Sequence, residues 1–365
     1  MPDPLPTAPY DQELSAANAD PSRQASSLGR IAAQDRESIV CPQLRRRHLL
    51  SIADIDQADF IGLVESSAVL GDKGGCQGAP LSGCSVGLDF RKTSTRTRVS
   101  FAAAAARLGA APITIGAGDL QVNTGETPED TMRVLGSYLS ALVVRTAGDP
   151  AELRMMAEVN RLSIINAMTS DEHPSQAISD LAMIRRHFGT LSGMKILYVG
   201  EGNNTAASLA LAVARSEGVT LVLHTPPGYG LNPNIASRAA ELSSLYGGLV
   251  VERPTPPPLG GGPFDIIYGT RWQTTGTNKP HPGWRDRFSP YKIDSAMMDR
   301  LGAPQAVFMH DLPAVRDEDC DGALLDGPRS IAFAQAEQKL FTAMAILAWC
   351  TGITIDADAC AGQMP

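Results

Sequence analysis

The sequence lacks an excess of positive charge. Its 31 Lys and Arg residues are outnumbered by 39 Asp and Glu residues, giving a formal net charge of −8. A surface that binds the phosphate backbone of nucleic acids needs a basic stripe, so this balance argues against a nucleic-acid partner. The short cluster Arg45, Arg46 and Arg47 is typical of a solvated face or of salt-bridge donors.

Paired cysteines and long apolar runs are also missing. The six cysteines are scattered, with no Cys-x-x-Cys pair and no histidine at zinc-ligand spacing, so neither a metal site nor a disulfide framework is indicated. The longest apolar stretch, around residues 101–118, is interrupted by Arg107 and is no membrane span. The first residues are acidic and proline-rich, unlike a signal peptide, and we expect a cytoplasmic protein without a membrane partner.

Length and composition predict two domains. The chain has 365 residues, of which 43% are hydrophobic, enough for two buried cores. Residues 1–40 show no sustained apolar period, and we expect a flexible N-terminal extension. Beyond them, helical and β-rich segments alternate, which predicts an α/β fold of two doubly wound parallel-sheet domains. We expect a helix over 57–70, strands over 86–90, 141–144 and 163–165, and a long last helix over 331–349.

A second α/β unit begins at Met194, with a strand over 195–199, a helix over 204–216 and a strand over 219–226. The turn Gly-Glu-Gly-Asn-Asn lacks the glycine spacing of a dinucleotide fingerprint, and no acidic ribose ligand follows it, so we expect no nucleotide cofactor. The stretch 253–263 is rich in proline and glycine. Because proline lacks an amide donor, we expect an exposed loop there.

An anion site is indicated where the strand over 85–90 gives way to an alanine-rich helix, expected over 99–108. The five residues at this junction are Ser94, Thr95, Arg96, Thr97 and Arg98. Unpaired backbone N–H groups and the positive end of the helix dipole favour a phosphate there, and an arginine can bind it through two parallel hydrogen bonds. The alternative is an ordinary Ser/Thr N-cap followed by two solvated arginines.

The surrounding string DFRKTSTRTRVSF, residues 89–101, resembles the carbamoyl-phosphate signature of the aspartate and ornithine carbamoyltransferases. The resemblance runs from about Arg47 to Trp349 and implies a carbamoyl-phosphate-binding domain over 41–185, an acceptor-binding domain over 186–330 and a C-terminal helix over 331–350 that packs on the first domain. Five further segments match in order: RHLLSIADI (47–55), TGETPEDT (124–131), VVRT (143–146), HPSQAISDL (173–181) and HDLP (310–313).

The resemblance assigns roles to particular residues. It implies that the carbamoyl-phosphate ligands are Ser94, Thr95, Arg96, Thr97, Arg145, His173, Gln176, Leu312, Pro313 and Lys339. Among them, the expected catalytic residues are Arg96, Thr97, Arg145, His173 and Gln176. Donors fixed near the carbamoyl oxygen stabilise the negative charge that develops there, and the leaving phosphate can take the proton of the amine, so neither a cofactor nor a metal is required. Taken alone, His173 is better interpreted as a helix-start histidine satisfied by backbone, but its place in a motif in register with residues 94–98 favours the ligand role.

Departures from the family pattern concern charge. Thr124 stands where aspartate carbamoyltransferases present a lysine to the neighbouring subunit, and Lys279 or Arg91 are candidates to replace that charge. Lys339 stands where the ornithine enzymes have an arginine. The resemblance still implies a homotrimer with shared sites, because the family completes each site with the loop corresponding to residues 120–126.

The acceptor pocket is a hybrid. Arg271 and Gln273 resemble the carboxylate-reading residues of the aspartate enzymes, whereas Asn204 replaces their arginine for a second carboxylate. Asp311 replaces the cysteine of the ornithine enzymes or the proline of the aspartate enzymes. It is either a substrate contact beside the attacking amine or a loop-capping carboxylate. We therefore predict an acceptor amino acid that is neither plain aspartate nor plain ornithine, such as a short diamino acid.

Two functions follow from these residues. The first is a carbamoyltransferase that moves the carbamoyl group of carbamoyl phosphate to an amino-acid amine, giving a ureido product and phosphate. The alternative is a catalytically silent structural or regulatory homologue in a carbamoyltransferase assembly, which Thr124 supports. The complete set Arg96, Arg145, His173 and Gln176 favours the enzyme.

Overall fold

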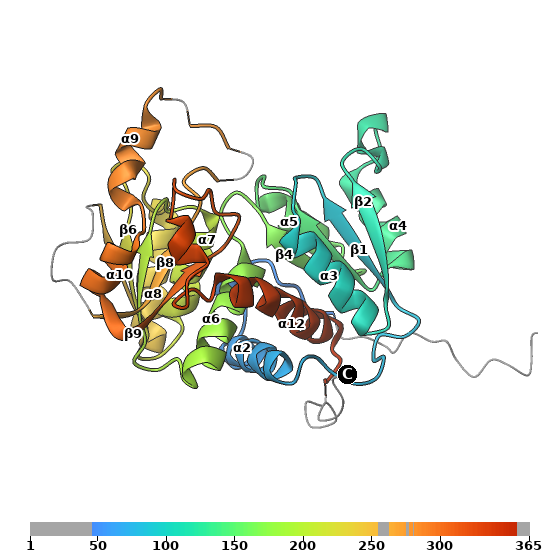
Figure 1. Cartoon of the computed structure of the whole chain (residues 1–365). Coiled ribbons are helices and arrows are strands. Elements are labelled where there is room, and N and C mark those ends of the chain that lie inside the picture. Colours follow the sequence, from blue (N-terminus) through green and yellow to red (C-terminus); the bar gives the residue numbers. More distant parts are fainter. Residues whose placement is uncertain (1–45, 255–262, 275–276, 280, 356–365) are drawn as a thin grey trace, which may run out of the picture. The chain divides into compact units, whose positions relative to one another are not determined.

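The computed structural model describes residues 46–254, 263–274, 277–279 and 281–355. Within these ranges the chain forms two parallel sheets flanked by helices (Figure 1), which confirms the predicted α/β class. The predicted N-terminal extension over 1–40 and residues 255–262 of the predicted loop lie outside the described residues.

The first sheet has four parallel strands in the order β2-β1-β3-β4. Three of them were expected from their apolar runs, and the edge strand β2 was not. Its second residue is Pro112, which an edge position tolerates because one side of the strand needs no donor. The strands are β1 (Ser85–Phe90), β2 (Ala111–Gly116), β3 (Ala141–Arg145) and β4 (Ser163–Met168).

The second sheet has five parallel strands in the order β7-β6-β5-β8-β9. The chain runs outward from β5 to β7 and then returns to the other side of β5 with β8 and β9, so the sheet is doubly wound. A switch of this kind leaves a crevice at the carboxyl ends of the strands. The strands are β5 (Lys195–Val199), β6 (Thr220–His224), β7 (Leu249–Arg253), β8 (Phe264–Gly269) and β9 (Gly302–His310).

The helices in the first half of the described chain include the two that begin at the proposed substrate-binding segments, α3 and α6. Helix α3 starts at Arg96, three residues earlier than expected, which places both arginines of the motif in its first turn. The segment 173–181, which resembled a carbamoyl-binding loop, is instead the start of α6. These elements are η1 (Ile52–Asp54), α2 (Gln57–Asp72), α3 (Arg96–Arg107), η2 (Gln121–Thr124), α4 (Pro128–Tyr138), α5 (Ala151–Glu158) and α6 (Pro174–Phe188).

The second half contains the predicted helix after β5 and the long predicted C-terminal helix. Its elements are α7 (Asn204–Ala214), α8 (Pro233–Tyr246), α9 (Trp284–Phe288), η3 (Ser289–Tyr291), α10 (Ser295–Leu301), α11 (Gly322–Leu325) and α12 (Ala332–Thr351).

Helix α12, drawn in red in Figure 1, packs against α2, α3 and α6. Most of its residues are buried, as expected for a helix that is apolar on nearly all sides. One polar contact fixes its register, because Gln338 Nε2 donates to the carbonyl oxygen of Ser67 in α2 at 2.7 Å. The helix therefore carries Lys339 from the end of the chain toward the residues at the start of α6.

Two further findings bear on the sequence-based expectations. No helix among the described residues is long and apolar enough to cross a membrane.

Cys84 is disulfide-bonded. The expectation that the scattered cysteines form no disulfide was therefore wrong at this position. Cys320 and Cys350 carry free thiols. Spacing along the sequence could not reveal this bond, because disulfide formation depends on the distance between the two cysteines in the folded chain.

Candidate active site

A cavity of about 240 Å³ lies where the carboxyl ends of β1, β3, β8 and β9 meet the first turns of α3, α6 and α7. Every residue that the sequence predicted for the site lines this cavity. They are Ser94, Thr95, Arg96, Thr97, Arg145, His173, Gln176, Asn204, Arg271, Gln273, Asp311, Leu312, Pro313 and Lys339.

The cavity is also lined by six residues that the sequence did not predict: Thr93, Met168, Asn203, Thr205, Thr270 and Thr274. Each lies within a few positions of a predicted residue, and most are small and polar. Proximity to the motifs was the available signal. Their residue types are too common in loops and caps to have been distinguished without the fold.

The start of α3 carries two arginines, Arg96 and Arg98, and lacks an ordinary side-chain cap among the residues that the structure describes. Thr95 precedes the helix, and within the described chain its side chain makes no capping hydrogen bond. Arg98 turns back, donates to the carbonyl oxygen of Phe90 at 3.0 Å and stacks on the Phe90 ring. Arg96 lines the cavity, and burial lowers its pKa while nearby Asp311 opposes that shift. The N-cap alternative therefore loses its main support.

Arg145, the last residue of β3, brings a second guanidinium to the same place. It is only 7% exposed, and burial together with the charge of Arg96 lowers its pKa to about 10. It remains a cation at neutral pH. Among the described residues its Nε atom has no hydrogen-bond partner. Two guanidiniums held together in a buried site stabilise an anion strongly, because the low local dielectric weakens screening.

His173 immediately precedes α6 and lines the cavity together with the two arginines. Its ring is buried, and burial, followed by the charges of Lys339, Arg145 and Arg96, holds its pKa well below the usual range. The imidazole is therefore neutral. Nδ1 lies 3.3 Å from the hydroxyl of Ser175, and the backbone N–H donates to Ser208 Oγ at 2.7 Å. A neutral imidazole can donate a hydrogen bond to a carbamoyl oxygen without adding charge to the site.

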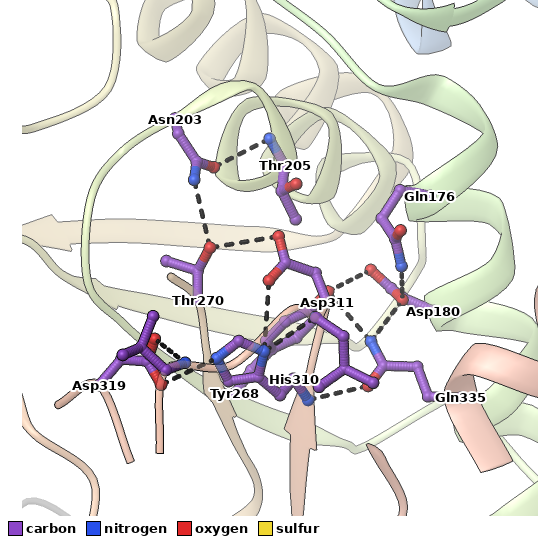
Figure 2. Close-up of polar contacts among 12 residues, drawn as sticks. Gln176, Asp180, Asn203, Thr205, Tyr268, Thr270, His310, Asp311, Asp319 and Gln335 are labelled. Carbon is purple, nitrogen blue, oxygen red and sulfur yellow. Dashed lines mark hydrogen bonds and ion pairs between the residues drawn. The ribbon is translucent and has the colours of Figure 1, made fainter. Parts of the chain in front are cut away.

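A buried polar network orients Gln176, as Figure 2 shows in part. Lys339 Nζ donates to Gln176 Oε1, and Gln176 Nε2 donates to Asp180 Oδ1 at 2.8 Å. Gln335 Nε2 and Tyr268 Oη each donate to the same carboxylate at 2.7 Å. Burial lowers the pKa of Lys339 and raises that of Asp180. The network joins α12, α6 and β8, and it fixes which end of the Gln176 amide faces each neighbour.

Asp311 brings a single carboxylate to the opposite wall. Its Oδ2 accepts from Thr270 Oγ1 at 3.2 Å, and Thr270 in turn accepts from Asn203 Nδ2 at 3.2 Å (Figure 2). Its Oδ1 has no hydrogen-bond partner among the described residues. Burial raises the pKa of Asp311. Asp311 therefore lines the cavity with Oδ2 bonded to Thr270 and with Oδ1 buried 3.5 Å from Nδ1 of His310 (Figure 2).

The other residues predicted to bind the acceptor differ in whether their polar atoms already have partners within the protein. Arg271 lines the cavity, and its Nε atom is buried without a partner in the described part of the chain. Gln273 Nε2 is used within its own loop, donating to the carbonyl oxygen of Thr277 at 2.9 Å. Asn204 Nδ2 donates to the carbonyl oxygen of Thr169 at 2.9 Å, which ties the start of α7 to the loop after β4. Arg271 is therefore the best candidate to bind a carboxylate.

The two candidates for the missing mobile-loop charge are engaged elsewhere. Lys279 forms an ion pair with Glu201 at 2.6 Å and lies over the rings of Tyr229 and Phe288. Arg91 pairs with Asp89 and Glu152. Neither lines the cavity. In this conformation neither replaces the family's lysine.

The described chain is an α/β protein with two parallel sheets and a cavity lined by arginine, lysine and small polar residues at the carboxyl ends of the strands. Comparison with known families agrees. Residues 47–186 match the model of the aspartate/ornithine carbamoyltransferase carbamoyl-P binding domain, and residues 192–350 match that of the aspartate/ornithine carbamoyltransferase Asp/Orn binding domain.

Individual relatives are similar over most of the chain. The ornithine carbamoyltransferase of Thermosynechococcus vestitus is 38% identical, over 85% of this chain and 97% of its own. The solved ornithine carbamoyltransferase of Pyrococcus furiosus superposes with a TM-score of 0.76 at 31% identity, covering 84% of this chain and 97% of that one. The Gloeobacter violaceus structure of the same name gives 0.72 at 35% identity, covering 85% and 100%.

The chain belongs to the aspartate/ornithine carbamoyltransferase family. It is a carbamoyltransferase, which moves the carbamoyl group of carbamoyl phosphate to an amino-acid amine.

Proposed function

We propose that the acceptor is a short amino acid whose carboxylate pairs with Arg271 and whose attacking amine donates to Asp311. The observation that carries this proposal is that one cation and one carboxylate, Arg271 and Asp311, line the same cavity. Gln273 and Asn204 complete that wall.

The sheet register supports a short acceptor. β8 and β9 are parallel neighbours, with Gly269 opposite His310. Asp311 follows β9 directly and Arg271 follows β8 after Thr270, and neighbouring strands lie about 4.8 Å apart. A short diamino acid such as 2,3-diaminopropionate spans such a pair. A second carboxylate would meet Asp311 and find Asn204 in place of an arginine, and like charge in a buried site costs several kcal/mol.

The residue roles follow from the same geometry. Ser94, Thr95, Arg96, Arg145 and Lys339 bind the phosphate. The carbamoyl oxygen accepts from Thr97, Arg145 and His173. Gln176 and the backbone of Leu312 and Pro313 hold the carbamoyl amide, and the Leu312–Pro313 bond is cis. The lone pair of the neutral amine attacks the carbamoyl carbon, the bond to the bridging phosphate oxygen breaks, and the phosphate takes the amine proton. Positioning and the fixed donors supply the rate enhancement.

We propose that different segments of the chain bind the two substrates. Residues 41–185 bind carbamoyl phosphate, residues 186–330 bind the acceptor, and residues 331–350 return to the first domain. The contacts of α12 with α2, α3 and α6 support the last assignment, and the two sheets support the first two. We also propose a cytoplasmic location.

We further propose a homotrimer, or a multiple of one, with shared sites. In the loop over 120–126, the residues whose side chains the structure describes do not line the cavity of their own chain. Thr124 Oγ1 donates to the carbonyl oxygen of Gln121 at 2.7 Å. Large apolar side chains are exposed on three nearby elements of the first domain, at Val99, Ile113, Val134 and Tyr138. We propose that these side chains lie together in the interface of the assembly, because a contiguous apolar patch favours protein–protein contact.

The acceptor is tested by a ureido-product assay with carbamoyl phosphate and a panel that includes 2,3-diaminopropionate, ornithine and aspartate. We expect the short diamino acid to give the highest kcat/KM and Arg271→Ala to raise its KM at least tenfold. The relatives named ornithine carbamoyltransferase make ornithine the competing acceptor. Highest activity with ornithine or aspartate, or an unchanged KM in Arg271→Ala, contradicts the proposal.

A further inference from the structure

The described chain that follows β8 forms part of the cavity wall and is fixed from behind by a buried lysine. Arg271, Gln273 and Thr274 line the cavity. Lys279, further along the same segment, does not line it, and its side chain is only 4% exposed. A buried ammonium group needs compensation from its neighbours, so the contacts of Lys279 show what its charge holds in place.

The carboxylate of Glu201 provides most of this compensation. Lys279 Nζ lies 2.6 Å from Glu201 Oε1. The other oxygen of the same carboxylate, Oε2, accepts from Thr274 Oγ1 at 2.8 Å. Glu201 follows β5, the central strand of the second sheet, and Tyr198 Oη donates to its carbonyl oxygen at 3.0 Å. One carboxylate therefore ties both Lys279 and a residue of the cavity wall to the centre of the sheet.

Three aromatic rings lie against the same ammonium group. Lys279 Nζ is 4.5 Å from the ring centroid of Tyr229, 4.8 Å from that of Phe288 and 5.4 Å from that of Trp284. At these distances the negative faces of the rings attract a cation. Phe288 is 0% exposed and Trp284 is 8% exposed, so the rings form a rigid, largely dry pocket for the lysine.

The same aromatic cluster also holds the start of the segment. Trp272, between Arg271 and Gln273, is 5% exposed and packs against Phe288 with 5.8 Å between ring centroids. Trp272 and Lys279 therefore anchor the chain to one cluster on either side of the wall residues. The anchor at Trp272 is apolar, whereas the anchor at Lys279 depends on the ion pair.

We propose that Lys279 is a positioning residue for the acceptor, and that its ion pair with Glu201 holds Arg271 in the geometry that binds the acceptor carboxylate. This inference rests on the proposed function of Arg271. Binding through a guanidinium fork depends strongly on geometry. Loss of the ion pair should therefore weaken acceptor binding, but it should not affect carbamoyl phosphate, whose proposed ligands Arg96 and Arg145 belong to the first sheet and its helices.

The test is steady-state kinetics of Lys279→Met, which keeps an apolar side chain of similar length among the rings and removes the charge. KM is measured for 2,3-diaminopropionate, ornithine and aspartate, and for carbamoyl phosphate with the best of these acceptors at saturation. We expect the KM of that acceptor to rise about tenfold and the KM of carbamoyl phosphate to stay unchanged. The matched control is Arg285→Met. Arg285 also lies over the Trp284 ring, but it is 59% exposed and pairs with Glu318, so both KM values should stay unchanged.

Glu201→Gln gives a second measurement, which keeps the inference testable if Lys279→Met does not fold. The amide has nearly the same shape as the carboxylate and lacks its charge. We expect a similar rise in the KM of the acceptor. The double variant should show no larger rise than Lys279→Met alone, because the two charges act as one unit.

Arg271→Ala separates this inference from the proposed function. If Arg271→Ala raises the KM of the acceptor and Lys279→Met leaves it unchanged, the ion pair contributes only to folding and the positioning role is wrong. If both variants leave it unchanged, Arg271 does not bind the acceptor and both proposals fail. An equal rise in the KM of carbamoyl phosphate, or additive effects of Lys279→Met and Glu201→Gln, would also overturn the positioning role.

Discussion

At the scale of single residues, the cavity is built around cations that the protein itself leaves without full compensation. Arg145 and Lys339 are 7% and 6% exposed, and Asp311 is the carboxylate that lines the cavity with them. Burying charge costs several kcal/mol unless a partner offsets it. An anionic substrate supplies that partner, so the folded protein is expected to gain stability when phosphate or carbamoyl phosphate binds.

Arg96→Ala should weaken carbamoyl phosphate binding by about 1.5–3 kcal/mol or more, because a charge-assisted bidentate contact is lost. Calorimetric titration with carbamoyl phosphate or phosphate measures the effect. The control is Arg107→Ala, which removes an exposed arginine from the last turn of the same helix and should bind normally. Equal affinities in both variants would contradict the anion site at the start of α3.

Glu172 predicts a pH dependence of stability. Burial raises the pKa of its carboxyl group from the usual 4.5 to about 7, so between these values the folded protein keeps a proton that the unfolded chain has lost. The stability from this proton is fully present below the unfolded-state pKa and is lost as pH rises through the folded-state pKa. Glu172→Gln keeps the acceptor for the Ile52 N–H and cannot ionise.

We therefore expect the unfolding free energy of the unaltered protein to fall relative to Glu172→Gln between about pH 5 and pH 7.5, by up to about 3 kcal/mol. Denaturant melts across this range measure the difference. Glu129→Gln, at an exposed position in α4, is the control and should follow the unaltered protein. Parallel curves for Glu172→Gln and the unaltered protein would show that the carboxyl does not titrate in this window.

At the scale of elements, the packing of α12 on α2 and α6 positions Lys339. Gly71 marks the closest approach, because a Cβ there would meet Arg186 Nη1 at 2.6 Å and would also collide with Gln338 Oε1. These two atoms are hydrogen-bonded to each other, and Gln338 also holds the Ser67 carbonyl. Glycine at this position lets the helices approach closely enough to make that network.

Gly71→Ala should destabilise the protein by about 1–3 kcal/mol, since overpacking forces the network apart. Gly62 is the matched control, because it lies in the same helix and a Cβ there meets nothing within 4 Å. Gly62→Ala should stabilise by about 0.5–1 kcal/mol through helix propensity. Shifts of the unfolding midpoint in the same direction for both variants would reject the close-packing argument.

At the scale of the whole molecule, the proposed trimer depends on the exposed apolar residues of α3, β2 and α4. Sedimentation should give three times the chain mass of 38.6 kDa, or a multiple of that value. Tyr138→Glu should dissociate the assembly and reduce activity, because Tyr138 is 70% exposed on α4 and charge in an apolar interface is costly. Leu245→Glu, equally exposed on α8, should leave it intact. A fully active monomer would contradict shared sites.

Much of this molecule is determined by local sequence. Apolar runs fixed β1, β3, β4 and β5 because a strand buried on both faces has few other options. All the predicted site residues line one cavity, because the motifs stand at strand ends and helix starts that the parallel sheets bring together. The edge strand β2 was missed, and the helical start of α6 was taken for a loop.

The tertiary structure decided everything that depends on contacts between distant segments. Lys339 meets Gln176 across 163 positions of sequence, and Asp311 meets Thr270 across 41. The packing of strands and helices also decides which groups a side chain faces. Lys279 faces Glu201 rather than the cavity, and His310 lies beside a carboxylate and a thiol. Local sequence sets propensity and donor type, but the environment of a side chain is set by neighbours that only the folded chain brings together.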